Sequence, residues 1–160
     1  MQRLILRFFL VFVLSSPLAL RAQVSPVAGP DQERMLASAD PRLAANKRLV
    51  YDFWREVLEA RHMDLANKYL TESYIQHNPN VATGRAAVVK YFSQFPTIPV
   101  AARVKAPLIG IVAEGDLVVV SSVQPMPDAK DPTKSYTTTQ FDMFRIEGGK
   151  IAEHWDPDRK

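Results

Sequence analysis

The chain of 160 residues contains no cysteine. Disulfide bonds, a lipid attached through cysteine and a cysteine nucleophile are therefore excluded, and the folded protein depends on its core for stability. The chain has 6 glycines, and they form no glycine-rich phosphate loop, so no nucleotide cofactor is implied. Ser121 and Ser122 lie in an apolar run without a neighbouring base, which gives nucleophilic catalysis little support.

The one long apolar run lies at the N-terminus. Arg3 and Arg7 supply a positive end, Leu4 to Leu14 are mainly apolar, and small residues lead to Ala22. This pattern predicts a signal peptide over residues 1–22, cleaved near Ala22, and hence a secreted or periplasmic protein. The run is short for a membrane span, and an uncleaved membrane anchor is the alternative.

A basic surface is also lacking once this segment is removed. The full chain has 20 Lys and Arg against 17 Asp and Glu, and loss of Arg3, Arg7 and Arg21 leaves 17 against 17. No cluster of basic residues is interleaved with aromatics, so nucleic acid is not an expected partner. The remaining residues, about 138, suit a single domain with no membrane contact after cleavage.

The order of patterns predicts an α+β domain over residues 41–160, after a flexible Pro- and Ala-rich leader over residues 23–40 with one helical turn near its end. Asp40 can cap a helix that Pro41 begins. Apolar spacing predicts three helices, over Pro41–Ala60, Met63–Leu70 and Arg85–Phe95. Four strands are then expected, over Arg103–Ala113, Leu117–Val123, Ser135–Ile146 and Lys150–Asp156.

The last two strands should form a hairpin around Gly148-Gly149. A three-residue loop with Gly149 in a bulge would pair Ile146 with Lys150, Phe144 with Ala152, Asp142 with His154, and Gln140 with Asp156, all on one face. A two-residue turn would instead pair Asp142 with Trp155 and break this polar cluster. We favour the three-residue loop.

A second chemically dense segment is Tyr74-Ile75-Gln76-His77-Asn78-Pro79. Pro79 keeps Asn78 out of helical geometry, so the segment is expected at a strand end or turn. The alternative is a turn in which the asparagine caps its own backbone and the histidine is solvated.

Together the two motifs resemble the SnoaL-like polyketide cyclase group of the nuclear transport factor 2-like superfamily, over about residues 46–156. The resemblance implies a cone-shaped curved antiparallel sheet around the helices, a pocket at the wide end, and a homodimer through the outer face of the sheet. It places Asp142, His154 and Asp156 on pocket-lining strands, with Gln76, His77 and Asn78 at the rim and Phe144 and Trp155 as apolar walls.

The implied function is cofactor-independent acid–base catalysis, an aldol-type cyclisation or an isomerisation, on a small hydrophobic carbonyl compound. Asp142 or His154 would be the base and His77, Gln76 or Tyr74 the donor to the enolate oxygen, so we assign catalysis to Asp142, His154 and His77. Substrate binding is assigned to eight residues: Tyr74, Gln76, Asn78, Phe144, Trp155, Asp156, Gln140 and Trp54.

Three other interpretations stay open. Asp142 with Arg145, or Lys150 with Glu153, would be simple ion pairs. His77, His154 and two carboxylates would form a metal site, which the spacing of these residues disfavours. The same pocket would also suit a small-molecule binding protein without catalysis.

Overall fold

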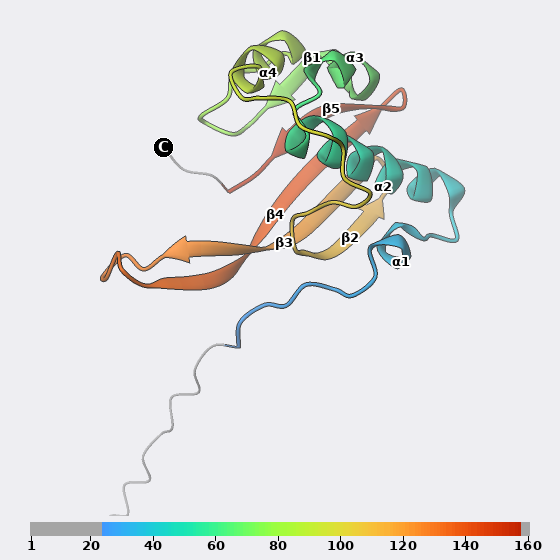
Figure 1. The fold of residues 1–160 in the computed structure, drawn as a ribbon. Helices are drawn as coiled ribbons and strands as arrows, with labels where there is room; N and C mark the ends of the chain where they lie inside the picture. The colour runs from blue at the N-terminus through green and yellow to red at the C-terminus, as the bar shows by residue number, and fades with distance from the viewer. Residues whose placement is uncertain (1–23, 158–160) are drawn as a thin grey trace, which may run out of the picture.

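A computed structural model describes residues 24–157 of the chain (Figure 1). The predicted signal peptide lies outside the described residues, and its cleavage stays a prediction. Within residues 24–157, no helix is both long and apolar enough to cross a membrane.

The domain is a five-stranded curved sheet with helices on one face (Figure 1). The strands are β1 (Leu70–Gln76), β2 (Leu108–Glu114), β3 (Leu117–Pro127), β4 (Ser135–Glu147) and β5 (Lys150–Trp155). Their order across the sheet is β1-β5-β4-β3-β2, with β1 parallel to β5 and the other neighbours antiparallel. This confirms the predicted α+β class with a curved sheet wrapped around helices.

The helices are α1 (Gln32–Leu36), α2 (Pro41–Phe53), the π-helix η1 (Trp54–Glu59), the 3₁₀ helix η2 (Met63–Leu65), α3 (Ala66–Tyr69) and α4 (Arg85–Phe92). Asp40 caps α2 as predicted, because its side chain accepts from the N–H groups of Arg42 and Leu43. The first predicted helix is continuous, but its last turn widens into η1, and π-turns of this kind concentrate at functional sites.

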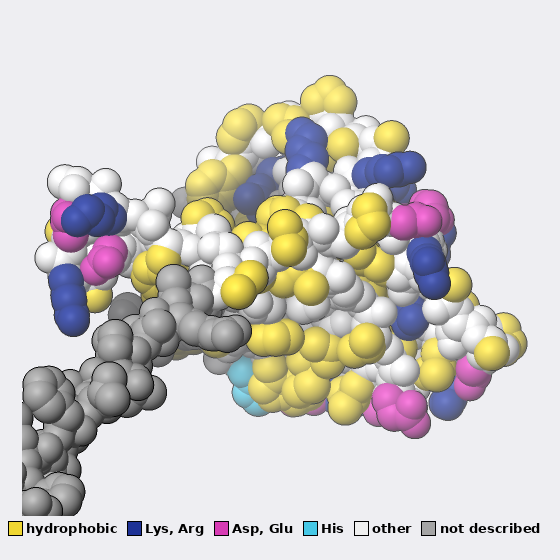
Figure 2. Space-filling view, turned by 90° about the horizontal axis from the view of Figure 1, so that it is seen from below, with side chains coloured by type: hydrophobic (Ala, Val, Ile, Leu, Met, Phe, Trp, Pro, Cys, Tyr) yellow, Lys and Arg dark blue, Asp and Glu magenta, His cyan; other side chains and the backbone are white. Residues whose placement is uncertain are grey.

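The core lies between α2 with η1 and the inner face of the sheet. Alternation along β3 and β4 directs Val118, Val120 and Phe144 to this face, where they meet Phe53 and Val57. The outer face stays partly apolar and uncovered, with Val112 62% and Phe141 55% exposed. Figure 2 shows hydrophobic side chains gathered over part of the surface, while charged side chains occupy the tip of the long β3–β4 arm.

Part of the expected leader is attached to the domain rather than free of it. Leu36 is buried in the core, the Gly29 N–H donates to the carbonyl of Leu108, and Gln32 accepts from the Tyr51 hydroxyl at 2.6 Å. The leader therefore contributes a short helix, α1, that packs against α2 and β2. The division of the chain into signal peptide, leader and domain stays a prediction.

Two element boundaries differ from the sequence-based expectation. Tyr74 to Gln76 belong to a complete strand, β1, that begins at Leu70, because a parallel partner in β5 supplies hydrogen bonds that local sequence cannot indicate. Strand β2 begins only at Leu108, since Pro107 lacks the N–H that a ladder needs.

The predicted register of the hairpin is wrong. Gly148 and Gly149 form a two-residue turn with φ of 57° and 74°, and Glu147 pairs with Lys150 and Ile146 with Ile151. A bulge then places Ala152 opposite no residue, so Arg145 pairs with Glu153 and Phe144 with His154. This extra residue, Ala152, turns His154 to the same face as Phe144, whereas the two-residue turn without a bulge would turn His154 to the opposite face. Asp142 and His154 therefore still share the inner face, although they are diagonal neighbours rather than direct partners.

Candidate active site

A cavity of about 190 Å³ lies between the inner face of the sheet and the helices. Its polar end is formed by Tyr74 and Gln76 of β1, Asp142 of β4, His154 of β5, and the adjoining Asn78 and Asp156. Apolar side chains complete the wall: Phe53, Leu58, Val81, Val88, Phe92 and Phe144. The structure thus brings seven of the predicted site residues together in one cavity.

His154 is the centre of the polar end. It is 7% exposed, and its Nε2 lies 3.0 Å from Oδ1 of Asp142, which is 9% exposed. Its Nδ1 lies 3.0 Å from Oε1 of Gln76 and 3.7 Å from Oδ2 of Asp156. The Phe144 ring stacks on the imidazole with ring centroids 4.6 Å apart. The imidazole is therefore fixed on both edges and on one face.

The hydrogen bonds around Gln76 determine which nitrogen of His154 carries a proton. The backbone N–H of Asn78 donates to Oε1 of Gln76 at 3.1 Å, which identifies that atom as the oxygen. Nδ1 must then be the donor in its contact with Gln76, so Nε2 faces the Asp142 carboxyl. Nε2 lies 3.0 Å from Oδ1 of Asp142, an arrangement suited to proton transfer between the imidazole and the carboxyl group.

Asp156 is anchored from the other side. The side-chain amide of Asn78 donates to its Oδ2 at 2.8 Å, so the loop after β1 and the end of β5 are joined at the mouth of the polar end. Asn78 also accepts at Oδ1 from the Asn80 N–H at 2.8 Å, which makes the predicted asparagine turn. Asn78 therefore lies at the pocket and also caps its own turn, although the sequence alone presents these two roles as alternatives.

Tyr74 contributes a hydroxyl to the same place. Burial, followed by the nearby charges of Asp156 and Asp142, raises the pKa of Tyr74 above its ordinary value, so the hydroxyl keeps its proton. Within the part of the chain that the structure describes, this hydroxyl has no hydrogen-bond partner. A protonated and unpaired donor thus faces the cavity beside the Asp142–His154 pair.

The residues that could hold a cation here are Asp142, His154 and Asp156, whose ligand atoms lie within 4.8 Å of one another. Both ring nitrogens of His154 already meet oxygen atoms of Asp142 and Gln76. A metal bound to this imidazole would have to displace one of them. The donor set as arranged fits a shared proton better than a metal.

Two predicted site residues lie on the other side of the sheet. His77 and Trp155 stack on each other with centroids 5.0 Å apart and an interplanar angle of 5°. His77 Nε2 contacts Oε1 of Glu153 at 2.8 Å. His77, expected at the rim, and Trp155, expected as an apolar wall, do not line this cavity, because both follow an inward residue in a strand or strand end and alternation turns them outward.

Gln140 and Trp54 also lie outside the cavity. Gln140 shares the inner face with Asp142 but lines a separate hollow on the β3–β4 arm. Trp54 lines an open hollow beside the cavity and meets the Phe144 ring at 6.4 Å and 71°. The predicted pairing of Gln140 with Asp156 does not occur, because β5 ends at Trp155, which pairs with Met143, so the pairing of β4 with β5 stops before it reaches Gln140.

The apolar wall from η1 and α4 is not predicted by the sequence. Leu58, Val88 and Phe92 lie in segments predicted to be helical, and helical spacing cannot distinguish a core face from a cavity face. The two ion pairs considered as alternatives, Asp142 with Arg145 and Lys150 with Glu153, are not formed. Arg145 instead binds Glu153 at 2.8 Å and Glu147 at 3.0 Å on the outer face.

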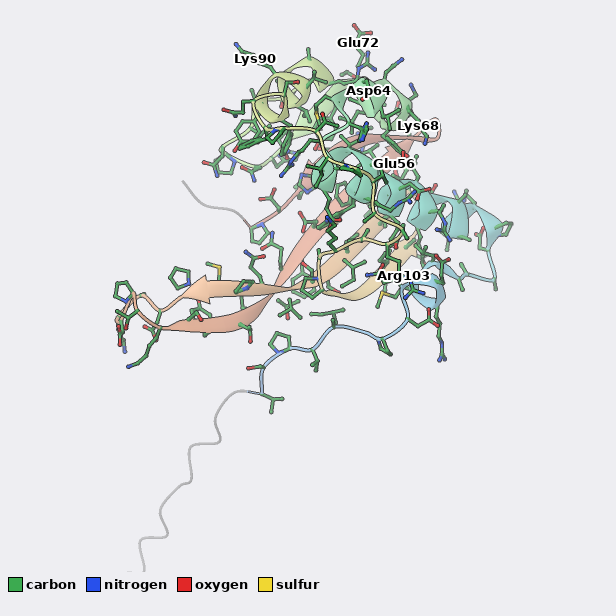
Figure 3. All side chains as sticks on the ribbon, in the orientation of Figure 1. Glu56, Asp64, Lys68, Glu72, Lys90 and Arg103 are labelled. Atoms are coloured by element: carbon green, nitrogen blue, oxygen red, sulfur yellow. The ribbon has the colours of Figure 1, made fainter. Side chains whose placement is uncertain are left out.

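The helical side of the cavity is held by a cluster of charged groups. The Tyr69 hydroxyl donates to Glu56 of η1 at 2.5 Å, and Lys68 contacts the same carboxylate at 3.2 Å (Figure 3). Burial and the bond to Glu56 raise the pKa of Tyr69 to about 12. Arg55 also contacts Glu56, at 2.9 Å. These bonds connect η1 to α3 and thereby fix the wall that Leu58 contributes.

Comparison with known proteins identifies the same fold. A candidate SnoaL-like polyketide cyclase from Jannaschia sp. CCS1 superposes with a TM-score of 0.51 at 15% identity, covering 76% of this chain and 91% of that one. A candidate polyketide cyclase from Acidithiobacillus ferrooxidans gives 0.50 at 18% identity, covering 75% and 89%. A nuclear transport factor 2-like protein of unknown function from Burkholderia pseudomallei gives 0.50 at 16%, covering 72% and 91%.

At these identities the superpositions show the fold alone. Among curated proteins, none matches this sequence. The SnoaL-like domain family, however, matches residues 50–154, which include η1, β1 to β4, β5 up to His154, and every residue that lines the cavity except Asp156. The resemblance inferred from the two motifs is confirmed, and the chain belongs to the family of SnoaL-like domain proteins.

Proposed function

We propose that the protein is a cofactor-independent enzyme that removes a proton next to a carbonyl group and uses the resulting enolate for an aldol-type ring closure or an isomerisation. The observation that carries the proposal is the buried Asp142–His154 pair at 3.0 Å, which faces a mostly apolar cavity. An isolated ion pair has no need of a cavity, whereas a proton-transfer site needs one.

Asp142 is the proposed base. Its Oδ1 meets His154, while within residues 24–157 its Oδ2 has no hydrogen-bond partner. Oδ2 takes the α-proton of the substrate, and the electrons of the C–H bond form the enolate. His154 is held by Gln76 on its other edge and keeps Asp142 oriented during this transfer.

Tyr74 is the proposed donor to the enolate oxygen. Its hydroxyl stays protonated beside two carboxylates, so it can donate to an oxygen on which negative charge develops. In a ring closure, the enolate carbon then attacks a second carbonyl of the same molecule, and the new alkoxide recovers the proton from Asp142. No cofactor takes part in this sequence.

The cavity limits the size of the substrate. Its volume is about 190 Å³. Pockets for drug-sized ligands begin at about 300 Å³. The reacting part of the substrate is therefore a small apolar carbonyl fragment rather than a system of several fused rings.

Isotope exchange tests the proposal without knowledge of the substrate. The protein is incubated in D₂O with a panel of small enolisable ketones, and loss of the α-proton signal is followed by NMR. Exchange faster than in protein-free buffer, and lost in Asp142→Asn, is the expected result. No exchange by the wild type with any ketone that binds would contradict the enzyme and support the second candidate, a small-molecule binding protein with the same cavity.

Export and self-association belong to the same proposal. Export is supported by the N-terminal pattern, and the mature protein should begin at Gln23 when its N-terminus is sequenced after expression of the full chain.

A homodimer is supported by the exposed apolar outer face of the sheet, which includes Val112 and Phe141. Light scattering should give twice the mass of one chain, and Phe141→Lys should halve it.

A further inference from the structure

A second hollow adjoins the catalytic cavity. It is open to solvent, has a volume of about 600 Å³, and is lined by Trp54, Leu58 and Glu59 of η1, by Arg61 and Phe92, and by Lys105 and Ala106 of the loop before β2. Leu58 and Phe92 line both spaces, so these two side chains form the partition between them. A molecule that passes this partition would occupy both compartments.

Arg61 has a backbone conformation that normally favours glycine. Its φ is 63°, and among the described residues it is the sole residue other than glycine with a positive φ. It follows the end of η1, where the His62 N–H donates to the carbonyl of Glu56, a position where helices commonly use glycine. Thr97 donates to the Arg61 carbonyl at 3.1 Å and holds this conformation. An arginine at this position provides a charged side chain, and the cost is backbone strain.

That side chain lies on an aromatic surface. The guanidinium carbon is 4.8 Å from the centroid of the Phe92 ring and 5.4 Å from that of Phe95. Phe92 belongs to the partition, so the guanidinium lies beside the boundary between the two compartments. The ring supports one face of the guanidinium and leaves its N–H edge available.

The two cations of the hollow are unpaired. Within the described part of the chain, neither the Arg61 guanidinium nor the Lys105 ammonium makes a hydrogen bond or ion pair with a protein group. Three other arginines, Arg48, Arg55 and Arg145, contact carboxylates instead.

The third charged group of the hollow, Glu59, is already occupied. Its Oε1 accepts from the Ala106 N–H and its Oε2 from the Lys105 N–H, both at 2.9 Å. This carboxylate holds the loop in place and does not neutralise Arg61. The hollow therefore presents two free cations against one engaged anion.

We propose that this hollow binds a carboxylate group of the substrate, with Arg61 as its main partner. The inference rests on the proposed function and specifies its substrate as a small oxo acid. The carbonyl part occupies the cavity at Asp142 and Tyr74, the chain passes Leu58 and Phe92, and the carboxylate meets the guanidinium fork. Arg61 is then a specificity-determining residue and Lys105 a second, more mobile cation.

Trp54 provides a readout that does not require turnover. It lines the hollow, and the chain has 2 tryptophans, so Trp155→Phe leaves Trp54 as the sole tryptophan fluorophore. In this background we would titrate straight-chain oxo acids of about five to eight carbons against their neutral amides. The acid should bind at least tenfold more tightly than its amide at one or more chain lengths, because a charge-assisted bidentate contact is lost in the amide.

Arg61→Gly is the decisive variant, because the observed φ suits glycine and the fold should be retained. It should lose most of the preference for the acid, because only Lys105 remains, and Arg61→Lys should keep a larger part of the preference as a point charge. Arg42→Ala is the matched control, since it removes one exposed cation at the other end of α2. Equal binding of acid and amide by the wild type, or an unchanged preference in a folded Arg61→Gly, would overturn the inference.

Asp142→Asn separates this inference from the proposed function. It should lose isotope exchange and keep the preference for the acid. A preference for the acid without exchange by the wild type would contradict only the enzyme. Exchange with neutral ketones without any preference for acids would contradict only the carboxylate site.

Discussion

His154 and His77 offer a comparison between the two faces of one sheet. Each imidazole contacts a carboxylate, His154 with Asp142 at 3.0 Å and His77 with Glu153 at 2.8 Å. Each also stacks on an aromatic ring, Phe144 in the first case and Trp155 in the second. The inner pair is buried and lines a cavity, whereas the side chain of His77 is 43% exposed.

The comparison shows that a histidine–carboxylate contact does not by itself indicate catalysis. In water the outer pair is screened and can exchange its partners with solvent. The inner pair is shielded, and its charge is strongly coupled to whatever enters the cavity. The two histidine–carboxylate pairs consist of the same chemical groups and differ in their surroundings. The following substitutions test whether that difference determines their function.

The largest expected effect comes from removing the Asp142 carboxylate, with removal of the Glu153 carboxylate as the control. Asp142→Asn should reduce the isotope exchange rate at least about 100-fold, the usual range for loss of a general base. Glu153→Gln is the matched change on the outer face and should leave exchange within about twofold of the wild type. Equal losses in both variants would refute the assignment of the two faces.

A smaller loss is expected for the donor. Tyr74→Phe removes a hydroxyl without changing the ring and should lower the exchange rate about 10- to 100-fold, while binding of a neutral ketone changes little. Tyr136→Phe, on the exposed arm, is its control. If Tyr74→Phe retained full exchange, the enolate oxygen would need another donor, and the amide of Gln76 or Asn78 would be tested next.

Much of the inner face can be predicted from the sequence. Alternation along β4, and separately along the segment from His154 to Asp156, places Asp142 with Phe144 and His154 with Asp156, and all four lie around the cavity. The three-residue loop expected between the strands is nevertheless wrong, because a two-residue turn and a bulge at Ala152 together give the same alternation. A bulge depends on neighbouring strands and has no clear local signal.

The rest of the site depends on contacts between distant segments. An irregular turn would make His77 equivalent to Gln76 and Asn78. Strand pairing instead continues to Gln76, which pairs with His154, and the next residue, His77, turns outward. Leu58 of η1 and Phe92 of α4 line the cavity because two helices that are distant in sequence both border it. Such placement follows from tertiary packing, which helix periodicity does not specify.

The turn between the last two strands is the third test. Gly149 has a φ of 74°, and no atom lies within 4 Å of the position that a Cβ would take, so Gly149→Ala should cost about 1 to 2 kcal/mol through backbone strain alone. Gly148→Asn should cost less, because asparagine tolerates this region. Urea unfolding measures both. Isotope exchange should persist in the folded fraction, since the bulge at Ala152 rather than the turn sets the inner face.

The smallest effect is expected from the outer pair itself. A hydrogen bond from His77, followed by one from Arg145, lowers the pKa of Glu153 below its ordinary value. Such a group adds stability above its unfolded pKa, about 4.3, and loses it as the pH falls through the lower folded value. His77→Ala should therefore shift the melting temperature by no more than about 2 °C at pH 7.

The pH dependence distinguishes this contact from simple packing of His77 on Trp155. With its main partner removed, Glu153 should have a folded pKa closer to the ordinary value, so the small stability difference between His77→Ala and wild type should shrink as the pH falls below about 4. Loss of stacking alone would give a difference that is constant with pH. Melting curves at several pH values between about 3 and 7 decide between them, and a catalytic defect in His77→Ala would return this histidine to the mechanism.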